Sequence, residues 1–272
     1  IKGMVGRELS DRFPKRESNI GYIMMEVKNW NAYHPLYSER KVVDDVNIYV
    51  RKGEVLGIAG LMGAGRTELA MSLFGKSYGE NISGQIFLNG KEVVLNTVQD
   101  AIDHKLAYVT EDRKGNGLIL SNPIKINTTL ANLDDVSKNG IIDKDKEYAV
   151  AVEYKNKLAT KCPTVEQNVG NLSGGNQQKV LLAKWMFANP DVLILDEPTR
   201  GIDVGAKYEI YCIINRLVAE GKSVIMISSE MPEILGMCDR IYVMNEGKMV
   251  GELNGKEATQ ELIMSRILQA GN

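Results

Sequence analysis

A glycine-rich segment that follows a short apolar run constrains this chain more than any other feature. Residues 54–59 read Glu-Val-Leu-Gly-Ile-Ala, which predicts a buried strand, and residues 67–74 predict a short helix. Between them stands Gly-Leu-Met-Gly-Ala-Gly-Arg-Thr at 60–67, which fits the phosphate-binding pattern G-x-x-x-x-G-K-[S/T] except at Arg66. Glycines let successive backbone N–H groups turn inward, and a helix N-terminus adds positive potential. The segment therefore predicts a cradle for phosphate, although a glycine-rich turn alone can also be a simple tight turn.

The one departure from this pattern concerns the lysine, which Arg66 replaces. Lysine carries a compact charge on a slim stem, whereas the arginine guanidinium is a bulky planar fork. We expect Arg66 to neutralise phosphate charge without following the lysine's route between the two terminal phosphates. Thr67 is placed to put its hydroxyl on Mg²⁺. The sequence thus predicts a nucleotide site that binds weakly.

A second feature is the apolar run 192–195 that ends in Asp196-Glu197-Pro198. A buried parallel strand delivers carboxylates to the carboxyl edge of a sheet, where doubly wound folds bind ligands. Asp196 is placed to hold Mg²⁺ through water, and Glu197 to polarise an attacking water for phosphoryl transfer. Taken alone, Asp196 and Glu197 fit equally well a strand that simply ends at two solvated carboxylates. Together with the upstream phosphate loop, it indicates nucleotide hydrolysis.

The third feature is Leu-Ser-Gly-Gly-Asn-Gln-Gln at 172–178, about twenty residues before the acidic pair. Ser173 is a good helix N-cap, and two glycines behind it leave the helix N-terminus open to an anion. This segment resembles the signature of ATP-binding cassette (ABC) ATPases. The resemblance implies an α/β fold of that type, with a P-loop NTPase (RecA-like) core, an antiparallel β subdomain and a helical signature subdomain. It also implies ATP and Mg²⁺ as cofactors.

The resemblance assigns roles residue by residue. Tyr37, or less favourably Tyr33, would stack on adenine, and Glu111 takes the place of the Q-loop glutamine. Ser229 falls where the family has its switch histidine, and Asp203 resembles the D-loop acid at the dimer interface. The implied nucleotide-binding residues are Tyr37, Met62, Gly63, Ala64, Gly65, Arg66, Thr67, Glu68 and Glu111; the metal-binding residues are Thr67 and Asp196; the catalytic residues are Glu197 and Ser229; the residues facing a partner's ATP are Ser173, Gly174, Gly175, Asn176 and Gln177.

The departures at Arg66, Glu111 and Ser229 weaken the nucleotide face, while the signature is intact. This combination is similar to the C-terminal ATPase half of bacterial monosaccharide importers of the ribose, xylose and galactose class. Stretches at 109–114, 172–179, 196–207 and 228–235 carry the resemblance. It implies three partners: an N-terminal ATPase half of the same polypeptide, a membrane permease and, indirectly, a periplasmic or lipid-anchored sugar-binding protein. It places the chain on the cytoplasmic face of the membrane.

Two other functions stay open at this point. One is a soluble ABC ATPase without a permease, and the other is a regulatory half that binds nucleotide but does not hydrolyse it. The 33 Lys and Arg against 35 Asp and Glu give a net charge of −2, which argues against a nucleic-acid partner. Apolar runs fall well short of the ~20 residues that cross a bilayer. The first residue is not Met, which suggests a piece of a longer polypeptide.

The chain divides by pattern into a linker or strap at 1–20 and a nucleotide-binding domain at 21–272, with a helical subdomain at about 123–188. Strands alternate with helices in the second half, which predicts a mostly parallel sheet. The expected strands are 22–27, 42–50, 54–59, 85–88, 106–109, 192–195 and 223–227, with a hairpin of 240–244 and 249–253. The expected helices are 67–74, 142–158, 173–188, 204–219 and 258–268.

Overall fold

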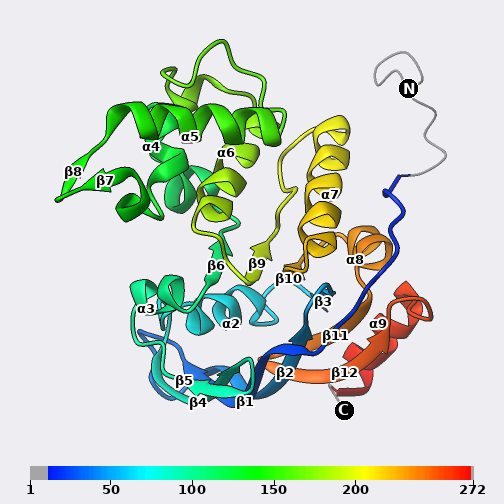
Figure 1. The fold of residues 1–272 in the computed structure, drawn as a ribbon. Coiled ribbons are helices and arrows are strands. Elements are labelled where there is room, and N and C mark those ends of the chain that lie inside the picture. Colours follow the sequence, from blue (N-terminus) through cyan, green and yellow to red (C-terminus); the bar gives the residue numbers. More distant parts are fainter. Residues whose placement is uncertain (1–11, 271–272) are drawn as a thin grey trace.

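The computed structural model describes residues 12–270, and within this range the chain forms three sheets and their covering helices (Figure 1). The strands are β1 (Ile23–Tyr33), β2 (Lys41–Arg51), β3 (Val55–Gly60), β4 (Glu80–Leu88), β5 (Lys91–Val93), β6 (Leu106–Val109), β7 (Ser137–Lys138), β8 (Ile141–Ile142), β9 (Val192–Asp196), β10 (Ser223–Ile227), β11 (Arg240–Asn245) and β12 (Lys248–Asn254). The α-helices are α2 (Arg66–Leu73), α3 (Val98–Asp103), α4 (Ile124–Thr129), α5 (Lys144–Lys157), α6 (Gly174–Phe187), α7 (Val204–Ala219), α8 (Met231–Met237) and α9 (Gln260–Ala270).

A six-stranded sheet forms the centre, in the order β12-β11-β3-β10-β9-β6. Five of its strands are parallel, and β12 pairs antiparallel with β11 at one edge. Because parallel strands end at the same edge, this sheet brings together the residues that follow β3, β9 and β6. The expected α/β fold with a mostly parallel sheet is confirmed.

A four-stranded antiparallel sheet, β2-β1-β4-β5, lies beside α2. Its β4–β5 hairpin turns at Asn89 and Gly90, whose φ values of 50° and 74° fit the tight turn that this dipeptide predicts. The Trp30 indole donates to Ser72 Oγ at 3.0 Å and so ties β1 to α2. This sheet therefore supports the helix that follows the glycine-rich loop.

The helices α4, α5 and α6 gather at the end of the molecule opposite the four-stranded sheet (Figure 1). Ser173 caps α6, and Asp143 caps α5 by accepting from the backbone of Asp145 and Lys146. The segment from α4 to α6 stands between β6 and β9 in the chain. It therefore holds the signature sequence at a distance from the phosphate loop of the same chain in Figure 1.

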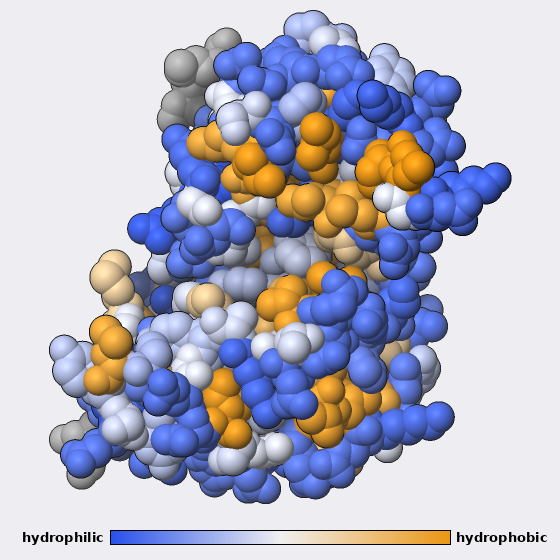
Figure 2. Space-filling view, turned by 90° about the vertical axis from the view of Figure 1, so that its left-hand side faces the viewer, coloured by the Kyte–Doolittle hydropathy of each residue, from blue (hydrophilic) through white to orange (hydrophobic). Residues whose placement is uncertain are grey.

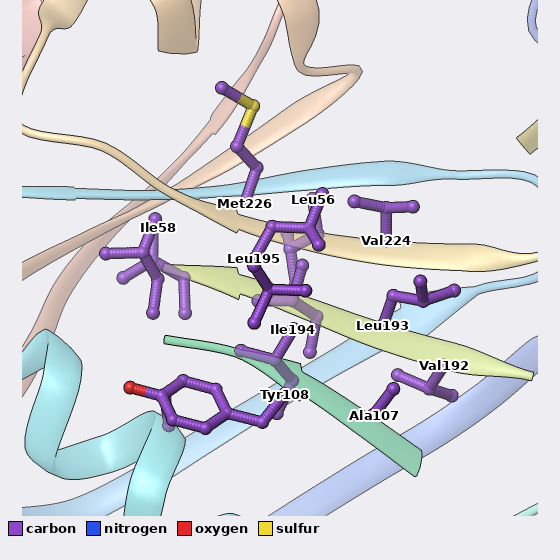
Figure 3. Close-up of a cluster of buried hydrophobic side chains, with 14 of the residues drawn as sticks. Leu56, Ile58, Ala107, Tyr108, Val192, Leu193, Ile194, Leu195, Val224 and Met226 are labelled. Carbon is purple, nitrogen blue, oxygen red and sulfur yellow. The ribbon is translucent and has the colours of Figure 1, made fainter. Parts of the chain in front are cut away.

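The central sheet carries the core. Its strands β3, β6, β9 and β10 are buried over their full length, as continuous apolar runs predict. Figure 3 shows side chains of these strands packed face to face, among them Leu56, Ile194 and Met226. The Tyr108 hydroxyl points out of this apolar cluster in the same view. The core thus ends where the polar residues of the site begin.

Residues 12–20 run along the surface beside α7 and α8 without regular structure (Figure 1). We call this segment the strap. Its Arg16 pairs with Asp239 at 2.6 Å, and the Phe13 ring lies 5.2 Å from the Tyr211 ring. A Cβ on Gly236 would come within 2.3 Å of the Phe13 ring, so a larger residue at 236 would push this ring away. Residues 1–11 of the predicted linker lie outside the described residues.

Most sequence predictions of elements match, and the differences have local causes. β1 extends to Tyr33 rather than ending near 27, because the chain bends at Asn29 (φ 49°) and then resumes pairing. β4 begins at Glu80, earlier than expected, since its first part is exposed and carries no apolar alternation. α8 was not predicted at all. Its seven residues are too few to show a helical period in the apolar pattern. Pro232 was not predicted to begin a helix, although proline is common at the start of one.

Candidate functional site

The glycine-rich loop forms a tight backbone turn between β3 and α2. Gly63 and Gly65 have φ values of 77° and 99°, which disfavour other residues. A Cβ on Gly65 would lie 2.5 Å from the Val42 carbonyl, whereas one on Gly63 would meet nothing within 4 Å. The loop is therefore packed on its Gly65 side and open at Gly63. Met62 on the same apex is 95% exposed.

Arg66 begins α2 and points into the protein. Arg66 is 8% exposed, and its Nη1 donates to the Ser228 carbonyl at 2.8 Å. Burial lowers the pKa of Arg66, which the carboxylates of Glu197 and Asp196 partly oppose. One edge of the guanidinium is thus hydrogen-bonded to the backbone carbonyl that precedes Ser229. How Arg66 acts on phosphate, in place of the lysine, stays a prediction.

Asp196 lies fully buried at the end of β9. Its Oδ2 accepts from the Tyr108 hydroxyl at 3.2 Å, while Oδ1 has no hydrogen-bond partner among the described residues. Burial raises the pKa of Asp196 to about 7, although the hydroxyls of Thr67 and Tyr108 act to lower this pKa. A buried carboxylate oxygen without a donor, beside a threonine hydroxyl, fits a hard cation such as Mg²⁺.

Replacing Asp196 with asparagine is expected to stabilise the chain by roughly 3 kcal/mol more at pH 8 than at pH 5. The native state holds the Asp196 proton up to a pKa of about 7, whereas the unfolded chain loses it near 3.8. The free energy of unfolding therefore falls as pH rises from 3.8 to about 7. Asparagine has no proton to lose, so the free energy of unfolding of the variant does not fall in this way. Urea unfolding at pH 5 and pH 8 measures it. An equal effect of the substitution at both pH values would contradict it.

Glu197 and Ser229 contact each other across the end of the sheet. The Ser229 amide donates to Glu197 Oε1 at 2.7 Å, and its hydroxyl donates to Oε2 at 3.1 Å. Glu197 itself has a left-handed φ of 47°. The structure thus brings the two predicted catalytic residues together, with both carboxylate oxygens of Glu197 occupied by Ser229.

Glu111 follows β6 at the same edge of the sheet. Its Oε2 accepts from the Thr110 hydroxyl at 3.0 Å and lies 3.4 Å from the Tyr108 hydroxyl. Tyr108 therefore stands between Glu111 and Asp196 and links them. Sequence reasoning missed Tyr108, because a tyrosine in an apolar strand reads as core.

The signature residues form the beginning of α6. Ser173 is exposed, and its hydroxyl accepts from the Asn176 amide at 3.5 Å and from Asn176 Nδ2 at 2.9 Å. Gly175 has no room for a side chain, since a Cβ would lie 2.5 Å from that of Ala206. Gln177 is buried and donates to the Val169 and Leu172 carbonyls. Gln177 was predicted to face the ATP of a partner, but its side chain is buried within its own chain.

Two neighbours shape the surroundings of the signature. Asp203 caps α7 by accepting from the Ala206 amide at 3.0 Å, so it has a structural role in addition to any interface role. Arg113 donates to the Arg200 and Gly201 carbonyls at 2.7 and 3.3 Å. Arg113 was not predicted, although its place just after Glu111 is a signal for it.

The candidate adenine residues lie at the end of β1. Tyr37 is 65% exposed, and its ring lies 5.0 Å from that of His34. Tyr33 is half-buried beneath Lys41, whose Nζ lies 5.7 Å from the Tyr33 ring. An exposed ring is free to stack on a base, which favours Tyr37. The choice between the two tyrosines stays a prediction.

The fold and these residues together define an ATP-binding cassette: a phosphate loop, an acidic strand end and a separate signature helix. Comparison with known proteins agrees. Residues 43–200 match the family described as ABC transporter, and the chain belongs to this family. It spans about half the length of the curated relatives it matches.

Three relatives illustrate the comparison. The L-arabinose transport ATP-binding protein AraG of Geobacillus stearothermophilus is 59% identical over 97% of this chain and 52% of its own length. The xylose import ATP-binding protein XylG of Thermoanaerobacter pseudethanolicus is 54% identical, with the same coverage. The ribose import ATP-binding protein RbsA of Clostridium perfringens is 49% identical over 100% of this chain and 53% of its own length.

Solved structures agree on the fold. The ADP conformation of an ATP-binding cassette of an ABC transporter superposes with a TM-score of 0.74 at 20% identity, covering 92% of this chain and 98% of that one. A nucleotide-free ATP-binding cassette gives 0.75, also at 20% identity, over 91% and 95%. The expected ABC ATPase fold is confirmed.

Proposed function

We propose that this chain is the second, partly degenerate nucleotide-binding half of an ABC ATPase that powers import of a simple sugar. The names of the relatives, which are sugar transport or import ATP-binding proteins, support the substrate class. The other half of the same polypeptide would hold the competent phosphate loop. The observation that carries the proposal is a combination of two features: the signature is intact and exposed at Ser173, and the Arg66 side chain of the phosphate loop is turned inward.

The signature would complete the site of the other half. Ser173 is exposed at the N-terminus of a 14-residue helix, where backbone N–H groups and the helix dipole favour a negative charge. The Asn176 amide groups hold the Ser173 side chain in place. In a head-to-tail pair, this tip would cap the γ-phosphate of ATP bound by the other half.

The chain's own site would bind nucleotide weakly and turn over slowly. Phosphates would lie over the open turn at Gly63, held by its backbone N–H groups. The free Asp196 oxygen and the Thr67 hydroxyl would hold Mg²⁺, which would supply positive charge to neutralise phosphate. Each Glu197 oxygen accepts one hydrogen bond from Ser229 and keeps a second lone-pair site, which could accept a proton from the attacking water.

Replacing Arg66 with lysine is expected to tighten ATP binding at this half by about tenfold, since one charge-assisted hydrogen bond is gained. A lysine lacks the planar fork that Arg66 uses on the Ser228 carbonyl and can reach along the loop instead. Titration of the 272-residue chain with a fluorescent ATP analogue measures this.

Arg51→Lys provides the control, because Arg51 lies at the end of β2 outside the loop and its variant should keep the original affinity. An unchanged affinity for Arg66→Lys would mean that arginine serves the loop as well as lysine does.

A permease would dock on the groove between α3 and the residues after α4. This groove is lined by apolar and polar side chains, including Ile102, Leu130, Leu133 and Lys105. Figure 2 shows hydrophobic side chains on both sides of the hollow between the upper and lower parts of this face. The segment from Glu111 to Asn122 leads from the site towards α4 and would pass nucleotide-driven motion to the permease. Docking of this kind would hold the chain at the cytoplasmic face of the membrane.

The sugar-binding protein would be an indirect partner, reached through the permease, and we expect no nucleic-acid partner. No helix among residues 12–270 has the length and apolar character to span a bilayer. The alternative of a soluble ABC ATPase predicts that no membrane protein accompanies the full-length protein through purification. The alternative of a purely regulatory half predicts no hydrolysis at Glu197.

A further inference from the structure

A buried carboxylate on α8 connects the segments that carry the site, although it touches none of the predicted site residues. Glu233 is 1% exposed. It accepts hydrogen bonds from the hydroxyls of Thr199, Tyr211 (2.6 Å) and Ser228 (2.8 Å), and Lys207 Nζ lies 3.2 Å away. Four hydrogen-bond donors compensate its burial and hold the pKa of Glu233 below its ordinary value.

These donors come from three places that matter for hydrolysis. Thr199 stands two residues after Glu197, and Ser228 stands one residue before Ser229. The Ser228 carbonyl accepts from Arg66, and Ser229 holds both oxygens of Glu197. Glu233 therefore ties together the two turns whose side chains meet at Glu197.

The third place is α7, which begins just after the signature's neighbour Asp203. Lys207 and Tyr211 lie one turn apart on this helix and both reach Glu233. The outer face of Tyr211 packs on Phe13 of the strap. A shift of α7 or of the strap would thus reach the turn at 228–229 through Glu233.

We propose that Glu233 is a positioning residue for hydrolysis at this half, which fixes the turn at 228–229 against Thr199 and so orients the Glu197 carboxylate. This rests on the proposed function, because it concerns the chain's own nucleotide site. Glutamine at 233 has nearly the same shape, but it presents an amide NH₂ in place of one accepting oxygen. It can no longer accept from Ser228 and attract Lys207 as well.

Hydrogen exchange of the peptide containing Ser229 tests the positioning directly in the 272-residue chain. The Ser229 amide is protected by Glu197, so loosening the turn should expose it. We expect Glu233→Gln to raise its exchange rate about tenfold, as loss of a charge-assisted hydrogen bond implies.

Glu54→Gln is the matched control. Glu54 is also 1% exposed and pairs with Arg240 at 2.8 Å, away from this turn. Its variant should leave exchange at Ser229 unchanged. Equal acceleration in both variants, or none in a folded Glu233→Gln protein, would overturn the proposal. If Glu233→Gln does not fold, Ser228→Ala removes one donor only and should raise exchange at the same peptide; normal protection there would also overturn it.

Kinetics of the full-length protein give the second readout, in a Ser173→Arg background that silences the other site. Glu233→Gln should lower the residual kcat about tenfold and leave KM for ATP unchanged, because the phosphate loop is untouched. A higher KM with the same kcat would contradict positioning of Glu197. A background without any turnover would count against hydrolysis at this half, while hydrogen exchange would still decide the role of Glu233.

Discussion

Replacing Ser173 with arginine in the full-length protein is expected to abolish sugar uptake and to lower ATP hydrolysis by about 100-fold or more, the range seen when a preorganised donor at a reacting phosphate or oxyanion is lost. The arginine would fill the space in front of the α6 N-terminus, where the γ-phosphate would lie. Ser173 is exposed and its Cβ is not packed, so the cassette itself should still fold. Uptake of labelled sugar by cells and phosphate release by the purified protein measure the two effects.

The Ser173→Gly variant distinguishes two effects of the arginine substitution: filling the space at the α6 N-terminus and removing the serine hydroxyl that caps the helix. Glycine is a tolerated N-cap and costs only a few tenths of a kcal/mol relative to serine, while it leaves the tip open. We expect this variant to keep most of its uptake. Near-normal uptake in Ser173→Arg would show that the tip of α6 does not cap nucleotide held elsewhere.

The second large effect is expected at Glu197. In the Ser173→Arg background, the remaining phosphate release should come from this half, and adding Glu197→Gln should lower it about 100-fold, as loss of a general base implies. Glutamine keeps the shape of the side chain and can still contact Ser229, so nucleotide binding should be retained. Single-turnover phosphate release and nucleotide titration measure the two properties.

Glu111→Gln is a useful comparison at the same edge of the sheet. It restores the residue that the family has at this position and should not reduce turnover. If Glu197→Gln leaves the residual rate unchanged, this half acts as a regulatory nucleotide site and does not hydrolyse ATP.

The sequence predicted best those elements whose signals are local. The bounds of α7 and β10 agree with the prediction because an Asp203 cap, an amphipathic period and a short apolar run mark them. β1 and α8 were less predictable, since a bend at Asn29 and a seven-residue helix leave no period to read. Apolar patterns report burial, and they are silent where a strand is exposed or a helix is short.

The candidate site shows a similar division. Motifs identified the loop at 60–67, Asp196 and the signature, because their chemistry is written in consecutive residues. The contact of Ser229 with Glu197 and the position of Tyr108 between Asp196 and Glu111 depend on segments that are far apart in the chain. No local pattern encodes such contacts, so Tyr108 and Glu233 emerge only from the fold.

The strap has a consequence for how two copies of this protein could meet. Phe13 occupies a slot over Gly236 and Tyr211 that a free strap would leave bare. If the strap of one molecule detached, the bare slot would offer the same contacts to Phe13 of a second molecule. Domain swapping of this kind would join two cassettes without a new interface. The ion pair between Arg16 of the strap and Asp239 works against such an exchange.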